Sequence, residues 1–305
     1  MRAIIRRMDA NTLHVAPSQQ TTRWGQDRRL EFIDWRLMWD RRLNRADLTT
    51  FFGISIPAAS LDIARYLELA PGNAVYDKSS RVYVAGPDFK PLYPGTSPER
   101  FLGDLLTRAG GEQADALSFT GWAPPIGVMP RPGRVVRPEV LLPLLRAIRE
   151  RRALAIAYQS MSSPEPGRRD IAPHALAHDG LRWHLRAYCY RREAFRDFLL
   201  GRILDVVDSD KEGSDGSEDE GWQRLVPLEL APHPSLSAGQ RRAIELDYGM
   251  TDGSVWLESR QALLFYVLRT LRLLSEEDER PEEQQLTLRN RSEVAVYLPS
   301  AAASR

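Results

Sequence analysis

The chain has 305 residues, a formal net charge of +1 at pH 7 and a single cysteine, Cys189. One cysteine excludes an internal disulfide and a thiolate zinc cluster, and it favours a reducing cytoplasm. No segment approaches the about 20 apolar residues of a membrane span, and the basic residues 1–20 lack the apolar run of a signal peptide. We therefore expect a cytoplasmic protein with no membrane partner, which begins with a flexible arm at residues 1–20.

The near-neutral total conceals two basic segments and one acidic segment. Residues 1–87 carry 13 Lys and Arg against 9 Asp and Glu, a net charge of +4. Residues 134–207 carry 14 against 8, a net charge of +6, and all 14 cations are Arg. Residues 208–305 carry 11 against 19, a net charge of −8. This uneven distribution predicts an anionic partner for the basic segments.

The first predicted elements are three helices. Apolar residues at helical spacing predict a helix over residues 25–43, with an inner face formed by Leu30, Ile33, Leu37 and Met38. Asn44 is placed to cap a short second helix, and Gly53 after it suits a tight turn. Ser55 is placed to cap the third helix, which begins with a proline and ends near residue 71. The inner face of this third helix is expected to carry Leu61, Ile63, Ala64 and Leu67.

A hairpin follows these helices, because residues 73–86 predict two short strands around an Asp-Lys-Ser-Ser turn. This order of elements is typical of a winged helix-turn-helix domain, here residues 21–87. In that fold the second helix of the pair enters the DNA major groove and the hairpin, or wing, contacts phosphates. The residues expected to face DNA are Ser55, Ala58, Ser60, Arg65, Lys78, Ser79, Ser80 and Arg81. A helical subdomain that binds nothing would show the same pattern, so the pattern alone leaves both interpretations open.

Residues 88–136 are rich in Pro and Gly around one predicted helix at residues 98–109. Their irregular composition separates two segments with regular periodicity, which indicates a domain boundary. We interpret them as a connector, anchored to its neighbouring domains by Tyr93, Phe119 and Trp122.

Residues 137–208 predict one helix and several short strands, which is typical of a small β-barrel. In the stretch LRWHLRAYCYRR, residues 181–192, one face is apolar and is expected to point into a core: Leu181, Trp183, Leu185, Ala187 and Cys189. The opposite face is polar and aromatic: Arg182, His184, Arg186, Tyr188 and Tyr190.

Polar residues gather in the sequence of this middle segment. They are Tyr158, Ser160, Arg168, Arg169, His174, Arg182, His184, Arg186, Arg196 and Arg202. Arg donates paired hydrogen bonds to planar oxyanions, and Tyr188 and Tyr190 offer rings on which a base can stack. The pattern favours a phosphate-bearing ligand, while a solvated face in an Arg-rich protein remains the alternative.

The acidic, Gly- and Ser-rich residues 209–221 are expected to form a solvated, flexible linker. Residues 222–305 predict a strand, a helix, a second strand, a long helix at residues 261–274, an acidic loop and two final strands. This is a small α+β domain with a predicted role in oligomerisation.

Catalysis is not expected from this sequence. There is no phosphate-binding GxxxxGK[ST] loop, no GxGxxG after a strand and no HExxH motif. His174 and His178 have a spacing used by metal ligands on helices, but Pro173 makes a helix unfavourable there. Cys189 lies on the apolar face. We therefore assign no catalytic residue, no metal and no cofactor.

The middle segment resembles a WYL domain, which is named for a Trp-Tyr-Leu strand motif. Here the motif is Trp183-His184-Leu185, so histidine replaces the tyrosine. Tyr158, Arg169 before Ile171-Ala172-Pro173-His174, and FRDFLLGRI at residues 195–203 also match. QRRAIELDYGM and RQALLFYVLRTLRL resemble the extension that follows WYL domains. The whole chain beyond residue 20 is most similar to WYL regulators that repress anti-phage defence operons of the BREX and CBASS types.

The resemblance implies a multidomain α+β fold: a winged helix-turn-helix, an Sm-like or SH3-like barrel and a small C-terminal dimerisation domain. It implies a homodimer bound to an inverted repeat in double-stranded operator DNA, and a nucleic-acid or nucleotide ligand on the WYL domain. Carried onto this chain, the ligand-sensing residues would be Tyr158, Ser160, Arg169, His174, Arg182, His184, Arg186 and Arg202. Histidine at the motif position keeps hydrogen bonding and stacking but adds a group that titrates near neutral pH.

A ligand-responsive repressor is the leading hypothesis. The same architecture can serve a transcriptional activator of a DNA-damage response. A third hypothesis is a nucleic-acid-binding accessory subunit without a regulatory role, which predicts sequence-independent and salt-sensitive binding.

Overall fold

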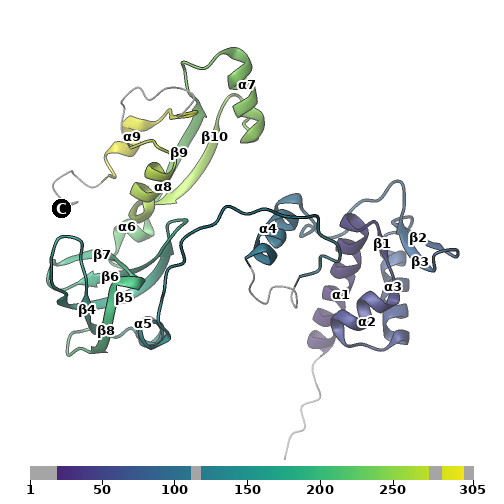
Figure 1. Ribbon diagram of the computed structural model, residues 1–305, viewed down its shortest axis with the longest axis horizontal. Helices are drawn as coiled ribbons and strands as arrows, with labels where there is room; N and C mark the ends of the chain where they lie inside the picture. Colours follow the sequence, from purple (N-terminus) through teal and green to yellow (C-terminus); the bar gives the residue numbers. More distant parts are fainter. Residues whose placement is uncertain (1–18, 111–117, 275–283, 299–305) are drawn as a thin grey trace, which may run out of the picture. The chain divides into compact units, whose positions relative to one another are not determined.

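The computed structural model describes residues 19–110, 118–274 and 284–298 (Figure 1). The chain divides into two compact units, Met1–Arg131 and Pro132–Arg305. The flexible arm expected at residues 1–20 lies outside the described residues except for residues 19 and 20, which begin the first helix. None of the described helices has the length and hydropathy needed to cross a membrane.

The first unit contains the predicted helices and hairpin. Its elements are α1 (Gln19–Trp39), β1 (Arg42–Leu43), α2 (Arg45–Phe52), α3 (Ile56–Leu69), β2 (Ala74–Asp77), β3 (Val82–Ala85) and α4 (Pro98–Ala109). The strands form an antiparallel sheet in the order β1-β3-β2. β1 was not predicted; α1 ends earlier than expected because Arg41 adopts a left-handed conformation with φ of 57°.

The core of the first unit extends into the expected connector. Phe119 is buried and packs edge to face against Phe32 and Phe51. The buried carboxylate of Asp34 accepts hydrogen bonds from the Leu92 and Tyr93 amides at 3.0 and 3.1 Å. It also accepts from Tyr66 Oη at 2.5 Å and Thr96 Oγ1 at 3.1 Å, so its buried charge is satisfied. Burial and this carboxylate raise the pKa of Tyr66.

Two of the three predicted anchors pack as expected. Phe119 and Tyr93 lie against the first core, whereas the indole of Trp122 is 62 % exposed. Trp122 contacts the C-terminal end of α1 through its main chain, because its amide donates to Asp40 Oδ1 at 3.2 Å. The described residues 88–110 and 118–122 thus belong to the first unit.

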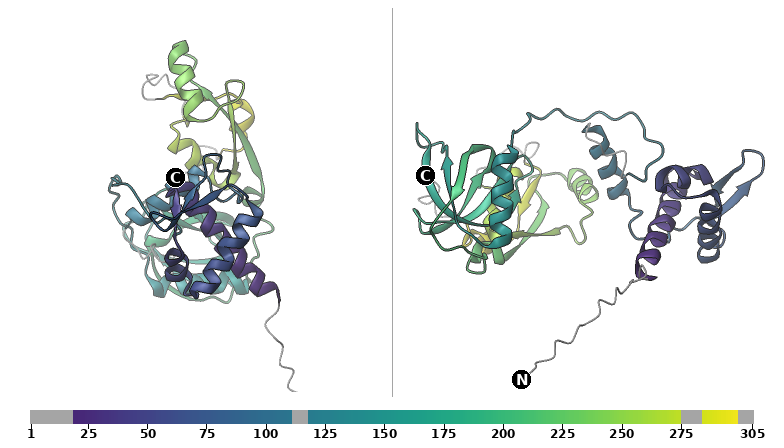
Figure 2. Two further views of the ribbon diagram at one scale, coloured as in Figure 1. Left: turned by 90° about the vertical axis from the view of Figure 1, so that its right-hand side faces the viewer. Right: turned by 90° about the horizontal axis from the view of Figure 1, so that it is seen from below.

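The second unit begins with one helix and five strands. They are α5 (Pro138–Glu150), β4 (Leu154–Tyr158), β5 (Gly167–His178), β6 (Trp183–Cys189), β7 (Ala194–Leu199) and β8 (Ile203–Asp208). The strands pair antiparallel in the order β7-β6-β5-β4-β8, with α5 packed against the sheet (Figure 2). Among the described strands, β7 and β8 are the two edge strands and do not pair with each other. The closed barrel expected from the sequence is therefore not seen.

The alternation predicted for β6 is partly correct. Leu185, Ala187 and Cys189 are buried in the core. Leu181 and Trp183 are 61 and 51 % exposed, so their predicted burial is wrong. They lie at the end of the β5–β6 hairpin, where His178 pairs with Trp183, and neither side chain belongs to the buried core between the sheet and α5.

The rest of the second unit is a smaller α+β layer. Its elements are α6 (Glu220–Gln223), β9 (Leu225–Pro232), α7 (Ala238–Asp247), β10 (Val255–Arg260), α8 (Leu264–Thr270), β11 (Leu286–Leu288) and α9 (Arg291–Ala295). The strand order is β10-β9-β11. The predicted long helix is shorter, because a 3₁₀ turn precedes α8 and Arg272 turns left-handed after it. The last predicted strand is wrong, since residues 291–295 form α9.

Candidate functional site

α2, α3 and the turn between them are fixed by local hydrogen bonds. The Asn44 side chain accepts from the Asp47 amide at 3.0 Å, and the Asp47 carboxylate accepts from the Asn44 amide at 2.7 Å. This reciprocal capping box starts α2, as predicted from Asn44. Gly53 ends it at φ of 65°, and Ser55 Oγ accepts from the Ala58 amide at 3.3 Å to start α3.

α3 is rotated relative to the predicted orientation. Ile63 is buried as expected, but Leu61 is 71 % exposed and Ala64 is also exposed. The cause is Asp62, which is buried and receives Arg29 Nε of α1 at 2.6 Å. A buried ion pair at this position turns Asp62 toward α1 and Leu61 toward solvent.

Six of the eight residues predicted to face DNA are exposed, on α3, at its N-cap or on the hairpin. Ser55 and Arg65 are exposed, and Ala58 and Ser60 are half-buried. The turn residues Lys78, Ser79, Ser80 and Arg81 are all exposed. Asp77 shapes this turn by accepting from the Ser79 amide at 2.9 Å.

Arg45 on α2, which was not predicted as a site residue, connects α3 to the hairpin. Its Nε donates to Ser60 Oγ at 2.9 Å, and its Nη2 donates to Tyr83 Oη at 3.2 Å. Its guanidinium lies 5.9 Å from the Tyr76 ring centroid and 5.6 Å from that of Tyr83. These contacts hold a cationic side chain between the two elements expected to touch DNA. No local sequence pattern predicts a contact among three separate elements.

In the second unit, two of the predicted sensing residues are occupied by an internal carboxylate. Arg186 donates to Asp219 through Nε at 2.7 Å and Nη2 at 2.9 Å. His174 Nε2 lies 2.9 Å from the same carboxylate. Burial alone raises the pKa of Asp219, but these hydrogen bonds outweigh it and hold that pKa far below its usual value.

The acidic segment 209–221 is therefore not a solvated linker at its C-terminal end. The Asp219 side chain is 2 % exposed and also caps α6 by accepting from the Trp222 amide. At Gly216, with φ of +78°, an added Cβ would lie 2.3 Å from His174 Nδ1. His174 is the extra residue of a bulge in β5, which aims its ring at this segment. The cations of the sheet draw Asp219 inward.

A second internal carboxylate occupies two more of the predicted sensing residues. Asp179 Oδ2 lies 2.9 Å from both Arg182 Nε and His184 Nε2. Burial raises the pKa of Asp179, but these bonds and two backbone amides lower it far more. His184 is buried beside the Tyr266 ring of α8, with centroids 4.7 Å apart. The described residues offer no partner to His184 Nδ1.

The remaining predicted sensing residues lie elsewhere. Tyr158 is buried in the core and accepts from the Leu199 amide at 3.3 Å, so its side chain is structural. Ser160 lies in the β4–β5 loop. Arg202 lies beside the start of this loop, because its carbonyl accepts from the main-chain amide of Gln159 at 3.0 Å. Tyr188 and Tyr190 pack edge to face against each other, not as a parallel platform.

Arg169 lies among like charges. Its partial burial and the nearby cations Arg191 and Arg192 lower its pKa. Within residues 118–274 and the other described ranges, no carboxylate forms an ion pair with Arg169, Arg191 or Arg192. We call this group of three guanidiniums the open Arg cluster. Arg191 and Arg192 were not singled out from the sequence.

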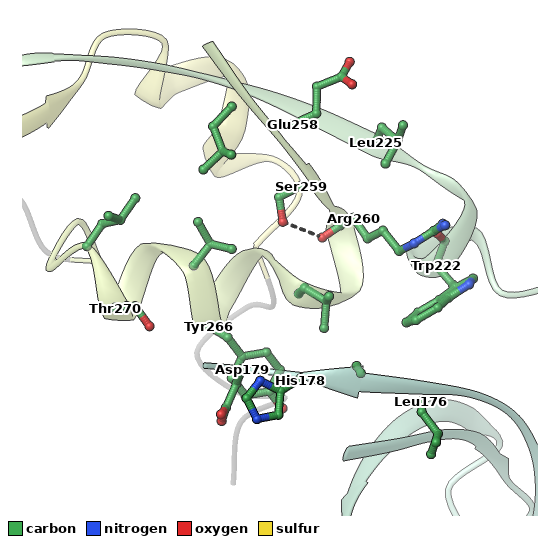
Figure 3. Close-up of a pocket in the computed structure, with 15 residues that line it drawn as sticks. Leu176, His178, Asp179, Trp222, Leu225, Glu258, Ser259, Arg260, Tyr266 and Thr270 are labelled. Carbon is green, nitrogen blue, oxygen red and sulfur yellow. Dashed lines mark hydrogen bonds between the residues drawn. The ribbon is translucent and has the colours of Figure 1, made fainter. Parts of the chain in front are cut away.

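The second unit also contains a cavity of about 640 Å³ (Figure 3). It lies between the end of β5 and the α8–β10 layer, and its lining is mostly apolar: Leu176, Leu225, Leu257, Leu263, Val267 and Leu271. None of the eight predicted sensing residues lines it. Arg260 closes one side, with its guanidinium 4.6 Å from the Trp222 ring centroid.

Models of known families match all three parts of the chain. A BrxR transcriptional regulator winged helix-turn-helix domain matches residues 25–106. A WYL domain matches residues 139–207. A BrxR transcriptional regulator C-terminal dimerization domain matches residues 225–294. The three-part architecture expected from the sequence is therefore present, and all three parts are regulatory or DNA-binding, not enzymatic.

Curated relatives match nearly the full length. A protein of Pseudomonas aeruginosa named DNA-binding transcriptional repressor CapW is 48 % identical over 90 % of this chain and 93 % of its own. Proteins with the same name from Escherichia coli and Stenotrophomonas maltophilia are each 46 % identical. They cover 92 and 90 % of this chain, and 94 and 93 % of their own. The chain belongs to the CapW family of DNA-binding transcriptional repressors.

Proposed function

We propose that this chain is a ligand-responsive transcriptional repressor that binds an inverted-repeat operator as a homodimer in the cytoplasm. The observation that carries the proposal is the exposed α3 beside a cationic wing tip, with Arg45 contacting both elements. The relatives' printed names and the match to a dimerisation domain support it. A two-fold dimer suits two half-sites separated by whole helical turns of DNA.

The regulated genes are proposed to form an anti-phage defence operon. The resemblance of the whole chain to repressors of BREX and CBASS operons supports this assignment. A repressor site should overlap the promoter core, whereas the site of a DNA-damage activator should lie upstream of it.

The proposed ligand is a nucleotide or a nucleic acid bound at the open Arg cluster. Arg186, Arg182 and the two histidines already contact internal carboxylates. A phosphate would have to displace a carboxylate there, whereas at the open Arg cluster the described residues offer no carboxylate to displace. Guanidiniums bind phosphate oxygens through paired hydrogen bonds. The ligand can regulate only if it binds the DNA-competent and DNA-incompetent states with different affinities. Residues 88–136 are the proposed path of that coupling, and rigidifying them should abolish ligand-induced release.

DNA recognition is tested by fluorescence anisotropy with the chain's own upstream DNA and a scrambled duplex of equal length. At about 150 mM salt, an operator-binding repressor should prefer the upstream DNA by a factor of about 10³ or more. Equal, weak and salt-sensitive binding to both duplexes would identify an accessory nucleic-acid-binding subunit instead.

Ligand sensing is tested by adding nucleotides and short single-stranded oligonucleotides to the operator complex. A true ligand should change operator affinity, and Arg169→Ala should remove this effect while leaving affinity without ligand unchanged. Arg149→Ala is the matched control, because the Arg149 side chain is 79 % exposed on α5 and outside the cluster. An equal response from Arg169→Ala and wild type would place the ligand elsewhere.

A further inference from the structure

The solvent face of α3 is apolar in its first two turns, whereas the exposed Arg65 and Glu68 follow toward its C-terminus. Ile56 is 64 % exposed and Leu61 is 71 % exposed. Pro57 and Ala64 are also exposed on this face, while the opposite face is buried against α1 and α2. The outer face of an amphipathic surface helix ordinarily carries charged and polar residues. Large apolar side chains here need a partner to cover them.

α3 offers few groups for hydrogen-bonded base recognition. Its sequence, IPAASLDIARYLEL, contains no Asn, Gln or Lys. The strong base contacts of the major groove are made by Arg or Lys to guanine and by Asn or Gln to adenine. Arg65 is the one residue of α3 that belongs to any of these four types. Asp62 is turned inward to Arg29, and Ser60 already accepts from Arg45. Hydrogen bonds from α3 therefore specify little of the sequence.

The thymine methyl group is the apolar group that a base pair presents in the major groove. We propose that Leu61 and Ile56 contact thymine methyl groups, so that these contacts select the bases facing the first two turns of α3. This inference rests on the proposed operator binding. Charge supports DNA as the occupant, because Arg45 connects α3 to the hairpin that carries the exposed Lys78 and Arg81. Arg65 also lies on the outside of α3, where it pairs with Glu68 at 2.9 Å.

The decisive probe is an operator in which deoxyuridine replaces thymidine. Uracil keeps every hydrogen-bonding group of thymine and lacks only the methyl group. Single replacements across each half-site should weaken binding about fourfold wherever the removed methyl group touches Leu61 or Ile56. Replacements at bases that α3 does not touch should have no effect. Anisotropy titrations at constant salt give these ratios directly.

A double-mutant cycle separates a methyl contact from a change in DNA flexibility. Leu61→Ala should bind the thymidine operator more weakly and should be insensitive to deoxyuridine at the one or two positions that Leu61 contacts. Ala is well tolerated at an exposed helix position, so the variant should fold. Leu102→Ala is the control: Leu102 is 59 % exposed on α4 of the same unit, and this variant should keep the full deoxyuridine penalty.

Four results would overturn the inference, and only the last would also overturn the proposed function. Full specificity for upstream DNA with no deoxyuridine penalty would leave the repressor function intact and exclude methyl recognition. A penalty that persists equally in Leu61→Ala would assign it to DNA shape. A Leu61→Ala variant that changes the sedimentation mass but not the deoxyuridine penalty would show that this face binds a second copy of the chain. Loss of all preference over scrambled DNA would instead overturn the proposed function as well.

Discussion

Asp219 joins the acidic segment to the WYL sheet through one buried carboxylate. Asp219→Ala would remove the bidentate partner of Arg186, which would keep Asp197, and would leave the His174 ring without the carboxylate that it contacts. Loss of the hydrogen-bond partner of a buried polar or charged group costs about 1–3 kcal/mol. We expect the free energy of unfolding of the second unit to fall by that order in urea titrations followed by tryptophan fluorescence. Asp215→Ala, at a side chain 42 % exposed, should change it by less than about 0.5 kcal/mol. Equal effects of both variants would contradict the assignment.

Asp179 and Asp219 both have pKa values below the unfolded value of about 3.9. A depressed folded pKa contributes stability above the unfolded pKa, and this stability is lost as pH falls through the folded pKa. The melting temperature should therefore decline as the pH is lowered from about 5 toward 2. Asp179→Asn should flatten part of that decline in differential scanning fluorimetry. An Asp179→Asn curve parallel to wild type over this range would show that the carboxylate is not stabilised by its contacts.

At the residue scale, the sequence indicated the cations but not their partners. Alternation along β6 correctly placed Arg186 and His184 opposite the apolar face. Their carboxylates come from a turn and from a segment 33 residues beyond Arg186, which no periodicity can pair with them. The role of Arg45 could not be predicted for the same reason, because it depends on contacts with two other elements.

We expect the wing and α3 to divide DNA recognition between them. Lys78→Ala and Arg81→Ala should each weaken binding to operator and scrambled DNA alike, because phosphate contacts carry no base information. Each should reduce the slope of log affinity against log salt by about 1. Lys90→Ala, another exposed lysine of the same unit, is the charge-matched control and should leave the slope unchanged. A loss confined to the operator would show that the wing reads bases.

At the element scale, helix starts were predicted well because they depend on local chemistry. Asn44 and Ser55 form the expected caps. The rotation of α3 was not predicted, because it depends on the long-range pair between Asp62 and Arg29. α9 was mistaken for a strand, because the Asn290 side chain that precedes it is fixed by bonds to the distant β9, including the Glu229 amide.

The whole molecule is expected to act as a dimer. Sedimentation equilibrium should give a mass near twice the 34.6 kDa of one chain. The matched dimerisation domain at residues 225–294 is the expected source of the contact. A monomer at concentrations that saturate operator DNA would contradict this prediction.

The three-domain order followed from composition, charge and the resemblance, since each domain has its own periodicity and charge. The predicted closed barrel is not seen, because closure requires pairing between β7 and β8, which the described strands do not make. Local sequence patterns predict single strands and do not determine whether the two edge strands meet. The arrangement of the two units relative to each other has no local signal in the sequence.

Operator binding is tested most directly by a footprint of the purified chain on its own upstream DNA at about 150 mM salt. We expect two protected half-sites related by two-fold symmetry, separated by whole helical turns and overlapping the promoter core. Uniform protection without a repeat, or none at concentrations that protect scrambled DNA equally, would contradict an operator-binding repressor.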